Sequence, residues 1–145
     1  MVTPTPEERP ADLGPRLDPT HLAVARFPRG WRPAVWPAAF ASVVEDDDEV
    51  TLVCAEADVE AVSGGVTPLD FEHGWRRVTF AGPLPWEQVG FLADVAGRLA
   101  AARIPFASVA AFTTDHVLVR AAQADLAVSV LAGEPAPEAR PGVEV

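Results

Sequence analysis

An aspartate and a histidine stand side by side in "FTTDHVLVR", between apolar runs that are typical of strands. Such a pair suggests acid–base catalysis, in which a carboxylate orients an imidazole. Neighbouring residues of a strand point to opposite faces of a sheet, so Asp115 and His116 are not expected to meet. The chain also has no serine in a nucleophile elbow. We therefore expect no catalysis here, and Asp115 remains open as a hairpin-turn residue or as a ligand-binding residue.

Two other groups of residues could bind a metal ion. The acidic run "EDDDE" (Glu45–Glu49) lacks the spacing and the glycine of a calcium loop, and consecutive carboxylates alternate in direction. The three histidines and Cys54 are dispersed along the chain, which gives no indication of a tetrahedral site. We interpret the acidic run as a solvated hairpin tip, and we expect neither a metal nor a cofactor.

The charge balance limits the partners that this chain can attract. The 145 residues carry 21 acidic and 11 basic side chains, for a net charge of −10, and every base is an arginine. Nucleic acids and anionic membrane surfaces attract clustered positive charge, so neither is an expected partner. The absence of lysine excludes Schiff-base chemistry on lysine and a Walker-type phosphate loop.

The sequence favours a cytoplasmic protein. The single cysteine cannot form an internal disulfide, and the N-terminal residues have no basic start followed by an apolar core, as a signal peptide would. The longest apolar stretches fall well short of the ~20 residues that span a bilayer. On these grounds we expect an intracellular, soluble chain.

Apolar periodicity predicts an α+β organisation in two related halves. The second half reads strand, helix, strand, strand, helix, which is the ferredoxin-like arrangement, and the first half is a reduced version of it. The motif "FASV" occurs at residues 40–43 and 106–109, at the start of the hairpin in each half. We predict two ferredoxin-like (βαββαβ) subdomains with an antiparallel sheet and helices on one face. The predicted segments are a disordered tail (1–19), an N-terminal subdomain (20–66), a C-terminal subdomain (67–133), and a mobile tail with a possible edge strand (134–145).

Within these halves the predicted elements are as follows. Strands are expected at residues 21–27, 40–44, 50–55, 75–82, 106–112 and 116–120, with helices at 56–62, 86–103 and 121–132. The proline-rich segment between the first two strands is expected to form a loop or one short helical turn.

The segments "GWRRVTFAGPL", Gly90 and "FTTDHVLV" resemble the small bacterial tandem ACT-domain proteins, which are related to the eukaryotic cytosolic arginine sensors. The resemblance covers about residues 20–131. Three features depart from the family pattern: Ala110-Ala111 replaces Ser-Thr, Thr113 replaces Asp, and His116 replaces an aromatic residue. The last departure suggests that His116 is a flat packing group, or that it tunes binding with pH.

The resemblance implies a regulatory protein that binds an amino acid and performs no chemistry. It implies a homodimer with the ligand at the interface between ACT subdomains, and an effect on another protein. The lining that it implies comes from the start of a helix and from a strand with the turn that follows it. These residues are Gln88, Val89, Gly90 and Phe91, then Ile104, Pro105 and Phe106, then Phe112, Thr113, Thr114 and Asp115.

Elementary chemistry supports these positions. The first turn of a helix has free N–H groups and a partial positive charge, which suit a ligand carboxylate. Gly90 has no Cβ and lets a ligand approach the backbone, although close packing of the helix on the sheet would also explain a glycine. Asp115 can accept hydrogen bonds from an α-ammonium group, and Thr113 and Thr114 add hydroxyls. The alternative is a structural or protein-binding module whose ligand pocket has been lost.

Overall fold

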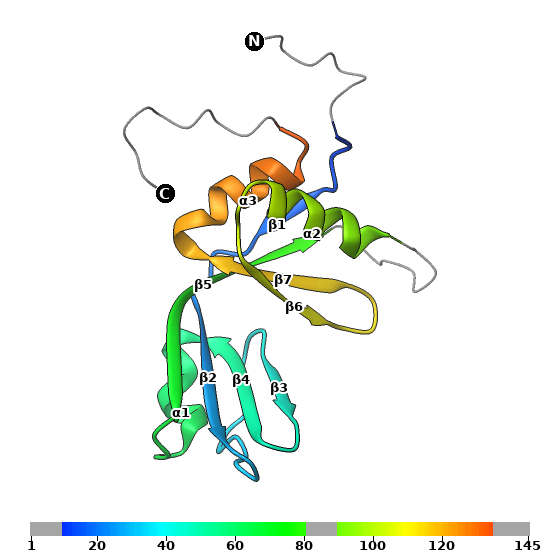
Figure 1. Cartoon of the computed structure of the whole chain (residues 1–145). Coiled ribbons are helices and arrows are strands. Elements are labelled where there is room, and N and C mark those ends of the chain that lie inside the picture. The colour runs from blue at the N-terminus through cyan, green and yellow to red at the C-terminus, as the bar shows by residue number, and fades with distance from the viewer. Residues whose placement is uncertain (1–9, 81–89, 135–145) are drawn as a thin grey trace.

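The computed structural model describes residues 10–80 and 90–134, and these form a seven-stranded antiparallel sheet with helices on one face (Figure 1). The strand order is β3-β4-β2-β5-β7-β6, with β1 also beside β5. The strands are β1 (Pro15–Leu17), β2 (Leu22–Pro28), β3 (Ser42–Glu45), β4 (Glu49–Ala55), β5 (Asp70–Phe80), β6 (Phe106–Ala110) and β7 (Asp115–Arg120). The helices are α1 (Val59–Ser63), α2 (Phe91–Ala101) and α3 (Ala124–Leu131).

Two lobes share strand β5. Its first part pairs with β2, its middle pairs with β7, and its last three residues pair with β1. We call β2, β3, β4, α1 and the first part of β5 the N-lobe, and the remainder of β5 with α2, β6, β7, α3 and β1 the C-lobe. Each lobe has the ferredoxin-like strand order, because β3-β4-β2-β5 matches β6-β7-β5-β1. The predicted α+β fold of two such units is confirmed.

The N-terminal segment was predicted to be a tail up to residue 19, but residues 15–17 form β1, the fourth strand of the C-lobe. Leu13 and Leu17 pack against the core of that lobe, and the Leu13 amide donates to the Leu131 carbonyl at 3.1 Å. Without β1 this edge of β5 would lose its backbone partners. The possible edge strand predicted in the C-terminal tail falls at residues 143–145, which lie outside the described residues.

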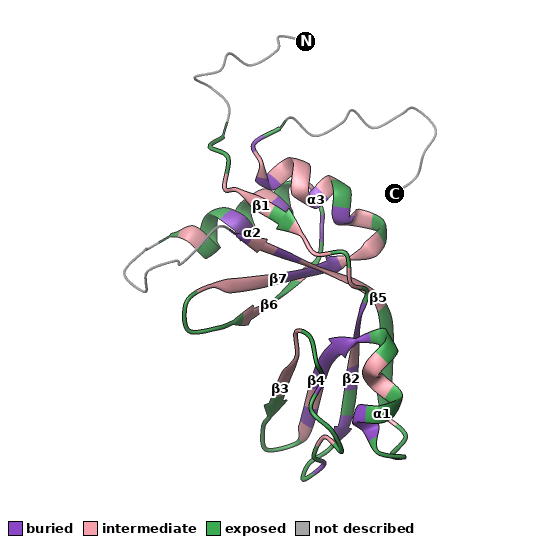
Figure 2. Ribbon diagram, turned by 180° about the vertical axis from the view of Figure 1, so that it is seen from behind, coloured by how far each residue is buried: buried purple, intermediate pink, exposed green. Residues whose placement is uncertain are grey.

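Three apolar clusters stabilise the fold: one forms the core of each lobe, and the third lies between the lobes. In the C-lobe, residues of β5, β6 and β7 pack against α2 and α3, and in the N-lobe the sheet packs against α1 (Figure 2). A third cluster of Leu22, Val53 and Leu118 brings together β2, β4 and β7, with Phe40 and Trp75 packed against it. This interlobe core connects the faces of the sheet that the helices leave open.

A β-bulge allows β5 to serve both lobes. Leu22 pairs with Trp75 and Val24 pairs with Glu72, so one residue of β2 lies opposite two of β5, which contains one extra residue. Gly74 lies in this bulge at φ 80°, and its amide donates to the Glu56 carboxylate at 2.7 Å. Side chains of a strand alternate between the two faces of a sheet, and the extra residue shifts this alternation by one position. Phe71 and Val78 therefore both face the helices, although one has an odd residue number and the other an even one.

Gly74→Ala should therefore lower the free energy of unfolding by about 1–2 kcal/mol, the cost of a left-handed backbone for an L-residue. Space is not the cause, since no atom lies within 4 Å of a Cβ built at Gly74. The matched control is Gly97→Ala in α2, which is equally uncrowded. That change should stabilise the protein by roughly 0.5–1 kcal/mol. Urea denaturation measures both, and equal effects would contradict the role given to the bulge.

The loop of residues 29–41 takes the place of the first helix of the N-lobe, as the prolines predicted. Trp31 stacks on Phe27 with ring centroids 3.9 Å apart, and its indole N–H donates to the Ser63 carbonyl. The Glu45 carboxylate accepts from the Gly30 amide at 2.9 Å and from Arg32 at 2.8 Å. These hydrogen bonds, the one from Arg32 first, lower the pKa of Glu45 to about 2. The loop closes the N-lobe core with a single aromatic side chain.

Candidate ligand-binding site

Helix α2 presents its N-terminus through Gly90, which is exposed and has φ 91°. No atom lies within 4 Å of a Cβ built there, so close helix-to-sheet packing does not explain this glycine. The left-handed backbone conformation does explain it. Phe91 follows, half-buried, with its ring edge-on to Phe80 at 5.0 Å. The predicted lining residues Gln88 and Val89 lie outside the described residues.

The β6–β7 turn carries the second predicted group. The Ala111 amide donates to the Thr114 carbonyl at 2.9 Å, while Phe112 and Thr113 are exposed at the tip. Asp115 is half-buried, opposite Ala110 of β6. Its carboxylate accepts no hydrogen bond from the residues that the structure describes, so the usual turn role of an aspartate is not seen at this position.

Asp115 and His116 do not form a catalytic pair. They stand at successive positions of β7, opposite Ala110 and Val109 respectively, and therefore on opposite faces of the sheet. The His116 ring instead packs on Phe40, with centroids 4.8 Å apart. This contact is consistent with the interpretation of His116 as a packing group, with the two rings tilted by 56°.

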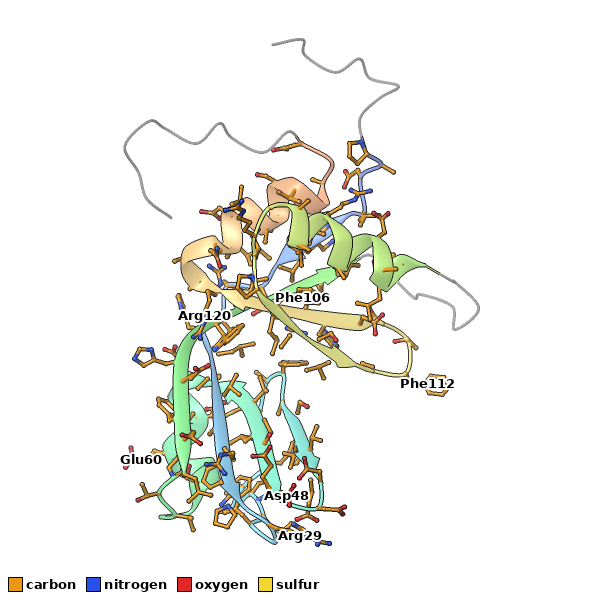
Figure 3. All side chains as sticks on the ribbon, viewed as in Figure 1. Arg29, Asp48, Glu60, Phe106, Phe112 and Arg120 are labelled. Atoms are coloured by element: carbon orange, nitrogen blue, oxygen red, sulfur yellow. The ribbon has the colours of Figure 1, made fainter. Side chains whose placement is uncertain are left out.

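The structure brings two of the three predicted lining segments to the same end of the C-lobe. The start of α2 and the β6–β7 turn lie at that end in both opposed views (Figures 1 and 2). Phe106 lies at the other end of β6 from the turn that carries Phe112 (Figure 3). Ile104 is 3% exposed and belongs to the C-lobe core.

Within one chain, Ile104, Pro105 and Phe106 therefore do not line one pocket with Gly90, and their place at a dimer interface stays a prediction. These residues follow the C-terminus of α2, whereas Gly90 precedes its N-terminus. Eleven residues of α-helix separate the two ends by roughly 16 Å. In a single chain, a ligand carboxylate can bind at the N-terminal end of α2. Ile104 follows the other end of the helix and is packed in the C-lobe core.

A polar cluster between the lobes was not predicted. We call Asp18, Phe40, Arg77 and His116 the junction cluster. Arg77 donates to the Asp18 carboxylate at 3.1 Å, lies 3.3 Å from His116 Nδ1, and stacks over the Phe40 ring at 4.4 Å. A cavity of about 40 Å³ adjoins Asp18, Phe40 and Arg77. The four residues come from four segments, so no local sequence pattern could have indicated them.

The environment shifts two titratable groups of this cluster. Burial, followed by the Arg77 cation, lowers the pKa of His116, while Asp115 acts in the opposite direction. Burial alone would raise the pKa of Asp18, but hydrogen bonds from Thr20 and the Arg77 guanidinium lower it below its ordinary value. At neutral pH Asp18 is therefore ionised and His116 is neutral.

The described residues contain neither a cluster of metal ligands nor a membrane-spanning helix. Over residues 10–80 and 90–134, no three His, Cys, Asp or Glu side chains come together as metal ligands. In the same two segments, no helix has the length and apolar character needed to cross a membrane.

Comparison with known proteins shows that the C-lobe is similar to one protein family. Residues 70–133 match the family model of the ACT domain. A search of curated protein sequences finds no match. The C-lobe, built on those residues and completed by β1, is thus similar to an ACT domain, and the chain as a whole has the two-unit fold described above.

Solved structures extend the likeness to nearly the whole chain. An Agrobacterium tumefaciens protein is 24% identical with a TM-score of 0.67, covering 86% of this chain and 91% of its own. The ligand-free regulatory subunit of aspartate kinase from Thermus thermophilus is 13% identical with a TM-score of 0.58, covering 84% and 97%. A Vibrio cholerae protein of unknown function is 19% identical with a TM-score of 0.61, covering 83% and 88%. At these identities the likeness shows the fold.

Proposed function

We infer that the chain is a non-enzymatic regulatory protein that binds an amino acid through its C-lobe. One observation carries this inference: the segment that matches the ACT domain has its α2 N-terminus and its β6–β7 turn at the same end. A kinase regulatory subunit among the similar structures supports a regulatory role. The separation of Asp115 from His116 on opposite faces argues against catalysis by that pair.

The two groups at this end are complementary to an α-amino acid. The first N–H groups of α2 and its dipole attract a carboxylate, and Gly90 leaves the approach to them open. Asp115 supplies a carboxylate for the ligand ammonium, and Thr113 and Thr114 supply hydroxyls. Burial of such a ligand needs a second surface, which we assign to the C-lobe of another copy in a homodimer. The ligand-bound dimer would act on a protein target in the cytoplasm.

A structural or protein-binding module is the second candidate. The observation that favours it is the position of Ile104 and Phe106, which lie away from the other lining residues, with Ile104 buried in the core of its own lobe. The exposed Thr113, where the family pattern has an acid, also removes a charge from the expected site. In that case the two lobes would serve only as a scaffold for a protein-binding surface.

Thermal-shift measurements against the twenty amino acids test the proposal. An amino acid that binds the folded state at about 100 times its Kd should stabilise it by about 2.7 kcal/mol. Asp115→Ala should then weaken binding by about ten- to hundred-fold, the value of a lost charge-assisted hydrogen bond. Asp47→Ala, which removes an exposed carboxylate from the β3–β4 turn, should leave calorimetric affinity unchanged. If no amino acid raises the midpoint at millimolar concentration, the module without a ligand becomes the better account.

A further inference from the structure

Phe40 links the junction cluster to the interlobe core. Its ring packs against the cluster of Leu22, Val53 and Leu118, which joins β2 and β4 of the N-lobe to β7 of the C-lobe. On its other side the ring contacts His116 and lies under the Arg77 guanidinium. The position of Phe40, and so the contact between lobes, depends on how Arg77 and His116 are held.

Arg77 is in turn held from three directions. Its carbonyl accepts from the Asp18 amide at 2.9 Å, and its guanidinium donates to the Asp18 carboxylate at 3.1 Å. A second guanidinium nitrogen lies 3.3 Å from His116 Nδ1. Asp18 lies in the link between β1 of the C-lobe and β2 of the N-lobe. One arginine of the shared strand β5 therefore contacts that link, strand β7 and the loop that carries Phe40.

We propose that His116 is a pH-sensitive latch between the two lobes: its neutral ring holds Arg77 over Phe40, and its protonation releases both. An arginine N–H can only donate, so the contact with Arg77 requires a lone pair on His116 Nδ1. That lone pair exists only in the neutral tautomer with its proton on Nε2. Protonation fills the lone pair and places two cations in contact.

The charges around His116 determine the direction of the response. Arg77 on β5 faces the ring, and Arg16 on β1 shares this face of the sheet by register, opposite Thr79. Asp115 is the neighbour on β7 itself, and Asp18 is reached through Arg77. Val109 on β6 and Phe40 add no charge. Burial and the adjacent Arg77 cation outweigh the opposing effect of Asp115 and disfavour a charged ring.

The pH range over which the latch opens follows from the direction in which the pKa of His116 is shifted. The pKa of His116 is lowered from an ordinary value of 6.5, first by burial and then by Arg77. A lowered pKa means that the unfolded or released state binds the proton more readily than the latched state. The contribution of His116 is thus complete above pH 6.5 and is lost as the pH falls through the lower value in the fold. Release removes the contacts of Phe40 with Arg77 and His116, and the lobes can then move about β5 and the remaining interlobe contacts of Leu22, Val53 and Leu118.

Distance measurements between spin labels on the two lobes test the latch in the full chain. Asp47→Cys in the β3–β4 turn and Asp125→Cys on α3 provide exposed label sites, while the native Cys54 is buried. Between pH 7.5 and pH 5 the interlobe distance distribution should broaden or shift. Circular dichroism at each pH, with unchanged secondary structure, distinguishes this from unfolding.

Two substitutions make the test specific. His116→Gln retains an acceptor for Arg77 but cannot become charged at pH 5, so the response to pH should be lost. His73→Gln removes a histidine of the bulge on the shared strand and should leave the response intact. The latch is wrong if the labelled parent shows no change before it unfolds, or if the His116→Gln protein responds as the parent does. NMR titration of the His116 ring should give the same midpoint as the distance change.

Discussion

Replacing Trp31 by alanine is expected to lower the free energy of unfolding by about 3–5 kcal/mol, the usual cost of truncating a buried large aromatic residue. Trp31 is 8% exposed, stacks on Phe27, and donates its indole N–H to the Ser63 carbonyl. Trp31 covers the N-lobe core at the place where a helix covers the core of the C-lobe. No neighbouring element can therefore fill the space that the truncated side chain leaves. The change should also leave the Ser63 carbonyl without this donor, which adds to the cost.

Trp36→Ala is the matched control for this prediction, because Trp36 lies on the same loop but is 67% exposed. A change within ~0.5 kcal/mol is expected there, as for most surface substitutions. Guanidinium denaturation of both variants makes the comparison. Similar losses in the two variants would mean that the loop stabilises the N-lobe through its backbone and not through the Trp31 ring.

Leu118→Ala should cost about 2–5 kcal/mol and should destabilise both lobes together. Leu118 is 1% exposed and packs with Leu22 and Val53, so its truncation opens a cavity between the lobes. Because β5 belongs to both lobes, loss of the interlobe core cannot be confined to one of them. Tryptophan fluorescence, with Trp31 and Trp75 in different clusters, and far-UV circular dichroism should report one shared transition at a lower midpoint.

Leu92→Ala on α2 provides the comparison, since Leu92 is 39% exposed and lies outside the clusters. Its effect should stay below about 1 kcal/mol, because little apolar area returns to water. Two separate transitions in the Leu118→Ala protein, with the C-lobe unchanged, would show that the lobes unfold independently and would refute the shared core.

Local periodicity was sufficient for most of the fold. Strands such as β2 and β4 carry continuous or alternating apolar residues, and they were predicted to within two residues at each end. The first part of β5 was missed, because "DFEHG" is polar and the bulge at Gly74 breaks its alternation. β1 was missed because three residues, "PRL", are too short to show any period.

The candidate site was predictable only where one segment carries the signal. The amphipathic run predicted a helix that starts at residue 86, whereas α2 has Gly90 as its N-cap, and the polar residues between β6 and β7 indicated a turn. Ile104 was predicted to line the pocket and is buried in the C-lobe core, because the apolar character of a residue fits a pocket wall and a core equally well. The contact between Arg77 and His116 joins residues 39 positions apart, and pairing of that kind follows from strand register, which one sequence does not reveal.

The place of β1 has a consequence for how the gene can be divided. The first strand of the chain completes the last lobe, and the strand between them belongs to both, so no single cut yields two whole units. A fragment that begins at residue 67 lacks its fourth strand and leaves an unpaired edge on β5. During synthesis β1 is made early but must wait for β5, some sixty residues later, before it can pair. A segment that carries a complete C-lobe must therefore run from β1 to α3 and include the N-lobe between them.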